Sequence, residues 1–123
     1  TGKRCFDLGR SIREAIATYE EDLKIVIFGT GGMSHQLHGE RAGVTNREWD
    51  TKFLDGLTQD PMGLTKTPFL EYVREAGAEG IEMVMWLIMR GALDDQVNEI
   101  YRHYHVPASN TSTGLIILEN EST

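Results

Sequence analysis

Cysteine is almost absent from this sequence, since Cys5 is the only one among 123 residues. A single cysteine cannot form a disulfide within the chain, and it cannot supply the paired thiolates of a structural zinc site. A chain that uses neither is typical of a reducing compartment. We therefore expect a cytoplasmic protein.

Positive charge and long apolar runs are also scarce. The 12 lysine and arginine residues are outnumbered by 19 aspartate and glutamate residues, which gives a net charge of −7. A polyanionic partner needs a basic surface, so this balance argues against nucleic acid and anionic membranes as partners. The most apolar segment, residues 81–93, contains Glu82 and Arg90 and is shorter than the roughly 20 residues of a membrane span. Small molecules and proteins remain as partners.

An initiator methionine and a basic-then-apolar leader are missing at the start of the sequence, which begins with Thr1. We expect that further residues precede Thr1 in the complete polypeptide. The length of 123 residues and the hydrophobic content of 40% correspond to one ordinary domain or to part of one.

The hydrophobic pattern predicts an α/β fold with a mixed or mostly parallel central sheet flanked by helices. The β-branched, glycine-bounded run at 23–28 predicts a buried, central parallel strand. No linker or repeat interrupts the pattern. The other expected elements are helices from residue 6 to 21 or 22 and over 46–57, 69–75 and 81–93, a loop over 58–68 with room for one short turn, extended chain over 101–106, a turn-rich loop over 107–113 and a second buried strand over 114–118.

The stretch GTGGMSHQLHG, residues 29–39, follows the first predicted strand. A dinucleotide-binding loop needs G-x-G-x-x-G leading into a helix, but Ser34 stands in the position of the third glycine, so this reading is weak. Glycines at the carboxyl end of a strand let the backbone turn tightly, which would direct His35 into a ligand crevice. Imidazole suits proton transfer near neutral pH, although a structural role is the alternative. His38 is either its partner or, as we favour, a surface residue.

Glu82 is the acidic residue within the apolar run of 81–93. A carboxylate is rarely buried without a partner, because removing an ion from water costs several kcal/mol. A metal ion or Arg90 would serve as that partner. Glu79 is more plausible as a helix-start acid or as a group that supports the site.

Two further groups of polar residues lie near the C-terminal end. His103 and His105 alternate along the predicted extended chain and so would share one face. With Glu82 they could form a metal site, but we favour a structural role. The loop at 107–113 offers hydroxyl and amide groups to a small ligand, although any turn contains such residues.

Three motifs, GTGGMSHQL, REAGAEGIEMVMWLIMRGAL and YHVPASNT, together resemble the class II extradiol ring-cleavage dioxygenases of the protocatechuate and gallate type. The resemblance extends over nearly the whole chain. It implies a non-haem Fe(II) enzyme that opens the ring of a carboxylated catechol or pyrogallol with O2, in the breakdown of aromatic compounds. It also implies a possible small companion (alpha) subunit or a homo-oligomer.

The resemblance assigns roles to individual residues. Two histidines and one glutamate hold the iron in this family, an arrangement that leaves positions open for substrate and O2. The glutamate corresponds to Glu82, and the histidine of GGMSH corresponds to His35, which acts there as the acid/base without binding the metal. Ser109 and Asn110 correspond to the loop that lies against the ring substituent of the substrate.

One feature of the family has no counterpart in this sequence. The two histidine ligands of the family come from an N-terminal part, and His38, His103 and His105 do not fall in those motifs. We therefore expect residues 1–123 to be the C-terminal portion of a single catalytic domain, inactive alone and completed by the missing N-terminal part. Two alternatives are a non-catalytic binding or assembly module and a zinc hydrolase that uses His35, His38 and Glu82.

Overall fold

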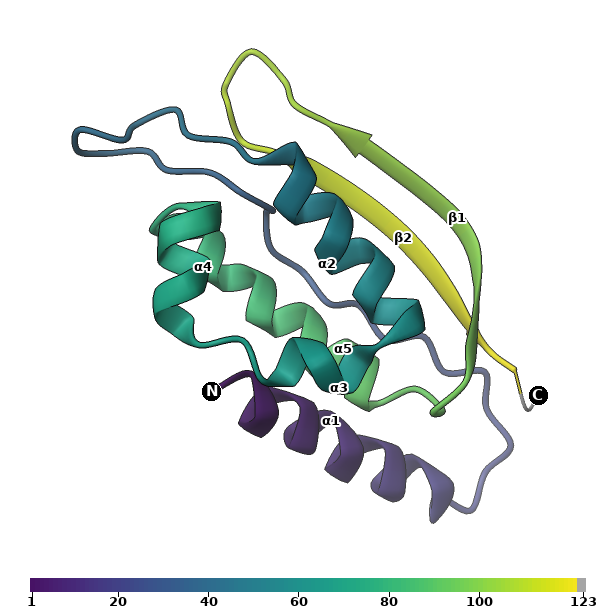
Figure 1. Ribbon diagram of the computed structural model, residues 1–123. Coiled ribbons are helices and arrows are strands. Elements are labelled where there is room, and N and C mark those ends of the chain that lie inside the picture. The colour runs from purple at the N-terminus through teal and green to yellow at the C-terminus, as the bar shows by residue number, and fades with distance from the viewer. Residues whose placement is uncertain (122–123) are drawn as a thin grey trace.

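The computed structural model describes residues 1–121 as a set of helices with one β-hairpin. In Figure 1 the hairpin lies along one side of the helices and the first helix along the other. The elements, in chain order, are α1 (Gly2–Ala17), α2 (Arg47–Gln59), α3 (Pro61–Thr65), α4 (Phe69–Ala76), the 3-10 helix η1 (Glu79–Val84), α5 (Met85–Gly91), β1 (Val97–His105) and β2 (Thr113–Asn120).

Strands β1 and β2 form an antiparallel pair whose register runs from Val97 opposite Asn120 to His105 opposite Thr113. The predictions of extended chain at 101–106 and of a strand at 114–118 are therefore confirmed. The prediction that the second strand is buried is wrong, because Leu115 and Ile117 are 51% and 46% exposed. This pair is the only sheet among residues 1–121, so the α/β class holds in the broad sense and a mostly parallel central sheet is not confirmed.

The strand predicted for residues 23–28 is not formed, and the prediction that it is buried is wrong. The segment has no regular secondary structure, and the side chains of Val26 and Phe28 are 73% and 82% exposed. A strand needs another strand to bond with, and no described strand pairs with this segment.

The helices largely follow their predicted positions, and local capping explains their bounds. Helix α2 begins after Asn46, whose side chain accepts a hydrogen bond from the backbone N–H of Trp49. The loop predicted for 58–68, with room for one short turn, contains the five-residue helix α3, because Asp60 caps a new helix that has Pro61 in its first turn. The helix predicted for 81–93 begins as the 3-10 helix η1 and ends at Gly91.

The hydrophobic core lies where α2, α4, η1 and α5 meet. Helix α1 packs against α5 on one side of it, and the hairpin covers another side. No helix among residues 1–121 is long and apolar enough to cross a membrane. The buried residues of this core are Met33, Phe53, Leu54, Leu57, Tyr72, Ala76, Met83, Val84, Trp86 and Leu87.

Candidate active site

The side chains of His35 and Glu82 face each other. Nε2 of His35 lies 3.6 Å from Oε1 of Glu82, and the Glu82 side chain is 43% exposed while that of His35 is almost fully buried. His35 lies within the glycine-containing stretch 29–39, and Glu82 belongs to η1. The structure thus brings together two of the residues singled out in the sequence, and their juxtaposition is partly open to solvent.

The glycines of the stretch allow the backbone to approach the Glu82 carboxylate. The N–H of Gly32 donates a hydrogen bond to Oε1 of Glu82 at 2.6 Å. A Cβ atom at Gly31, where φ is 147°, would lie 3.2 Å from Cγ of Glu82, and one at Gly32 would lie 3.0 Å from Oε1. Larger residues would therefore push the carboxylate away from its hydrogen-bond donor.

The ring of His35 is oriented by the backbone carbonyl of Met33. Nδ1 lies 2.7 Å from the carbonyl oxygen of Met33, and because a carbonyl can only accept, Nδ1 carries the proton in this contact. Nε2 is the other ring nitrogen, and it is the one that faces Glu82. The backbone N–H of His35 donates to the carbonyl of Ala76 at 2.8 Å, which ties the residue to the end of α4.

Gly77 is the position where this attachment is most sensitive to substitution. Its φ is 88°, and an added Cβ would overlap the carbonyl group of His35. We expect Gly77→Ala to lower the free energy of unfolding by about 1–3 kcal/mol, because both backbone strain and overlap must be relieved. Urea unfolding of the chain measures this loss. Gly39→Ala is the matched control, since Gly39 has a φ of 83° but its Cβ would meet nothing closer than 3.6 Å. An equal loss in both variants would mean that the contact with His35 contributes nothing.

Asp50 is a buried carboxylate that the sequence analysis missed. Its Oδ1 accepts from the N–H of Ser34 at 3.0 Å, and its Oδ2 accepts from the Ser34 hydroxyl at 2.6 Å and from the Tyr104 hydroxyl at 2.5 Å. Burial raises the pKa of Asp50, while the hydrogen bonds from Ser34 and Tyr104 oppose this rise. Asp50 therefore fixes the residue that directly precedes His35. Its position on the same face of α2 as Leu54 and Leu57 was the available signal.

Ser109 and Asn110 lie in the turn that joins β1 to β2, and both are exposed. Asn110 has a positive φ of 56°, and its N–H donates to the carbonyl of Pro107. Ser112, two residues further on, exchanges backbone hydrogen bonds with Met33 and Ser34 at 3.0 and 3.2 Å. The loop that carries Ser109 and Asn110 is thus attached to the stretch that carries His35.

Arg90, one of the two alternatives considered as the partner of Glu82, bonds to other groups. The guanidinium group of Arg90 is buried and donates hydrogen bonds to the backbone carbonyls of Leu57, Asp94 and Asp95. Burial lowers the pKa of Arg90. The arginine therefore holds the end of α5 to its surroundings and leaves His35 as the ionisable neighbour of Glu82.

The remaining candidate residues do not join the site. His38 is exposed, and Oε2 of Glu79 accepts from the N–H of Leu37 at 3.2 Å. His103 and His105 share one face of β1, as predicted, with their ring centroids 6.5 Å apart. Within residues 1–121 no three His, Cys, Asp or Glu side chains come together as a metal site, so neither of the two trios considered from the sequence forms.

Comparison with known proteins identifies relatives of the chain. The family model described as the catalytic LigB subunit of aromatic ring-opening dioxygenase matches residues 1–114. Gallate dioxygenase of Pseudomonas putida is 48% identical over 120 residues, which are 98% of this chain and 35% of that enzyme. The chain thus spans about a third of the length of this relative.

Proposed function

The chain belongs to the family of the catalytic LigB subunit of aromatic ring-opening dioxygenases. From this we propose that it supplies part of the active site of an enzyme that opens an aromatic ring with O2. The proposed substrate is a carboxylated catechol or pyrogallol, such as protocatechuate or gallate. The supporting observation is the approach of His35 to Glu82, with Nε2 and Oε1 3.6 Å apart. In this proposal residues 1–123 are the C-terminal portion of a single catalytic domain. A small companion (alpha) subunit or a second copy of the chain remains a predicted partner.

Glu82 is the residue of this chain proposed to hold Fe(II). Its carboxylate oxygens suit that ion, its side chain is accessible, and the N–H of Gly32 fixes one of the two oxygens. This carboxylate fits one ligand of an iron site. The described residues do not form a group of three ligating side chains, so the other ligands would come from elsewhere. When bound, the iron would act as a Lewis acid that makes a substrate hydroxyl more acidic.

His35 is proposed to take the proton from that hydroxyl and to return it later in the reaction. The contact of Nδ1 with the Met33 carbonyl leaves Nε2 as the nitrogen for this exchange. A general base must reach its proton within hydrogen-bond distance, and Nε2 faces the carboxylate of Glu82, the residue that would hold the iron. Ser109 and Asn110 are proposed to contact the ring substituent of the substrate from the β1–β2 turn.

The proposal is tested by comparing the chain alone with a chimera, in which the chain replaces the matched 120 residues of the Pseudomonas putida gallate dioxygenase. With Fe(II) supplied, we expect the chimera to consume O2 and gallate and the chain alone to do neither, because one carboxylate holds Fe(II) weakly. An oxygen electrode and the ultraviolet absorbance of gallate report both.

Two outcomes would contradict this expectation. Ring opening by the chain alone would mean that it holds a complete site. A chimera that folds and retains Fe(II) but consumes no gallate or protocatechuate would favour the second candidate, a non-catalytic binding or assembly module of the same fold. The observation that favours this candidate is the absence of a three-ligand group among the described residues.

A further inference from the structure

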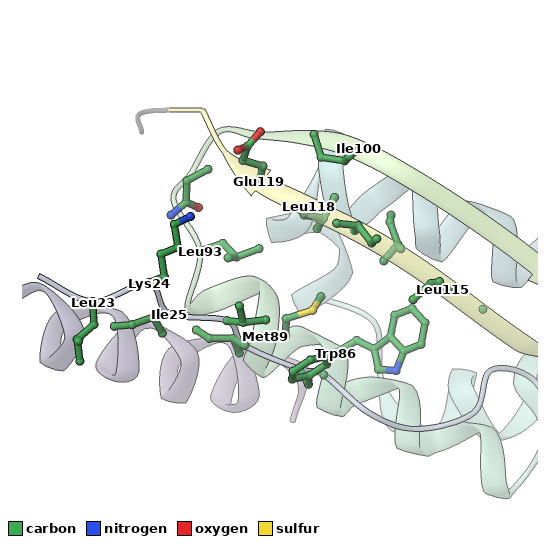
Figure 2. A pocket seen from close by; sticks show the side chains of 18 residues that line it. Leu23, Lys24, Ile25, Trp86, Met89, Leu93, Ile100, Leu115, Leu118 and Glu119 are labelled. Carbon is green, nitrogen blue, oxygen red and sulfur yellow. The ribbon is translucent and has the colours of Figure 1, made fainter.

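An apolar groove of about 830 Å³ separates the segment 23–29 from strand β2. Figure 2 shows side chains from both walls, with Ile25 on one side, Leu115 and Leu118 on the other, and Met89 and Trp86 at its floor. The groove does not include His35 or Glu82, so it is separate from the candidate active site.

Both walls of the groove have unpaired backbone groups. None of residues 23–29 makes a backbone-to-backbone hydrogen bond with another described residue, although their β-branched composition is typical of a strand. Within residues 1–121, β2 is paired only with β1, which leaves its second edge open. Unpaired backbone donors and acceptors beside apolar side chains are a template for another strand.

The two walls match in length and run in opposite directions. Residues 23–29 and residues 114–120 line the groove along seven residues each, a length of about 23 Å for an extended chain. In Figure 2 Leu23 lies toward the end of the groove where Glu119 is found, whereas Leu115 lies toward the other end. A strand placed between the walls would therefore be parallel to one and antiparallel to the other.

We propose that this groove receives a β-strand of about seven mainly apolar residues. The strand would belong to the same polypeptide, outside residues 1–123. The chain corresponds to 35% of the gallate dioxygenase of Pseudomonas putida, so most of that enzyme is available to supply it. A helix would leave the backbone groups of both walls unpaired, because its own N–H and C=O groups bond internally. The inserted strand would join segment 23–29 and β2 into one sheet.

A second copy of the chain does not offer a suitable strand. The occupant must have both edges free, and in the described residues β1 and β2 already use one edge each for their own pairing. Segment 23–29 is unpaired but forms a wall of the groove itself. Gly29, at the end of this wall, lies close to the floor of the groove, since a Cβ atom there would be only 2.9 Å from Cβ of Met89.

Hydrogen exchange of the backbone amides tests the proposal. In the chain alone we expect the amides of residues 24–28 to exchange at nearly the rate of an unfolded peptide. In the chimera we expect every second one of them to exchange at least about 100-fold more slowly, because successive N–H groups of a strand point to opposite edges and the inserted strand binds those on its own side. Fast exchange of these amides in a chimera whose α1 and α5 amides are protected would overturn the proposal. Protection that grows with the concentration of the chain alone would also overturn it, since the occupant would then be a second copy.

A pair of matched variants separates the groove from general surface effects. Phe28 and Leu70 are 82% and 73% exposed, but only Phe28 lines the groove. We expect Phe28→Lys to remove the protection of residues 24–28 in the chimera and Leu70→Lys to leave it unchanged. Equal behaviour of the two variants would contradict the proposal.

The test also holds if the chimera fails to fold. The chain is then co-expressed with the unmatched remainder of the gallate dioxygenase as a separate polypeptide. A one-to-one complex that Phe28→Lys abolishes and Leu70→Lys preserves supports the proposal, and the absence of a complex overturns it. Ring opening is measured separately, so a protected but inactive chimera would contradict the proposed function alone.

Discussion

Replacing His35 by glutamine in the chimera is expected to lower the turnover of gallate by about 10²–10⁴-fold, which is the usual contribution of general acid–base catalysis. The side-chain NH₂ group of glutamine can still donate a hydrogen bond to the Met33 carbonyl, which accepts from Nδ1 of His35 in the native chain. It cannot exchange a proton at neutral pH. The iron content and the affinity for substrate should therefore change little, and steady-state kinetics together with metal analysis measure the difference.

Glu82→Ala is the contrasting variant. We expect its main effect to be a loss of bound iron, whereas His35→Gln should keep its iron. Glu82 and His35 lie side by side, so both variants alter the same small region. A pattern in which Glu82→Ala loses iron and His35→Gln keeps it would agree with the separate roles of ligand and acid/base. Loss of iron from His35→Gln would make His35 a ligand and overturn its assignment.

The proximity of His35 and Glu82 could not be derived from local patterns. Their association rested on a resemblance to a family, whereas the structural reason is the glycine turn that brings the N–H of Gly32 to Oε1 of Glu82. Short-range features were more accessible to prediction. The cap at Asn46 and the alternation of His103 and His105 are set by neighbours in sequence, and both elements lie close to where they are expected.

The strand predicted for 23–28 illustrates a limit of sequence patterns. A run of β-branched residues indicates a segment that suits a sheet, but a strand exists only when another strand pairs with it. In the described residues that pairing partner is missing, so the segment stays without regular structure beside an apolar groove. The proposed inserted strand would supply the pairing partner that this segment lacks.

Arg90 and Asp50 show why the partners of buried charges escaped prediction. Arg90 lies in the same apolar run as Glu82, yet it bonds to the carbonyl of Leu57, which packing brings to it, and to those of Asp94 and Asp95, just beyond the end of α5. Asp50 satisfies the argument applied to Glu82, namely a carboxylate on an apolar helix face, and its partners Ser34 and Tyr104 lie far from it in sequence. The hydrophobic pattern of the sequence therefore identifies a buried charge, but it does not identify the group that stabilises that charge.

Asp50→Ala is expected to be among the most destabilising substitutions in the chain. Asp50 is fully buried, and its removal leaves the N–H of Ser34 and the hydroxyl of Tyr104 without their acceptor. Each buried donor left unpaired costs about 1–3 kcal/mol, so the free energy of unfolding should fall by several kcal/mol. Urea unfolding at neutral pH measures this loss. In the chimera the same variant should lower turnover, because Ser34 no longer fixes the residue next to it, His35.

Asp50→Asn separates the hydrogen bonds from the charge. The amide oxygen of asparagine can accept from the N–H of Ser34, and its NH₂ group can donate to the hydroxyls of Ser34 and Tyr104, so we expect a smaller loss than in Asp50→Ala. Burial raises the pKa of Asp50 above its ordinary value of 3.8, so the folded state binds the proton more tightly than the unfolded state. Its contribution to stability is therefore full below pH 3.8 and lost as the pH rises through the folded pKa. Asp50→Asn should abolish this part of the pH dependence. An alanine variant as stable as the asparagine variant at neutral pH would contradict the role of the hydrogen bonds, because only asparagine offers hydrogen-bonding groups to Ser34 and Tyr104.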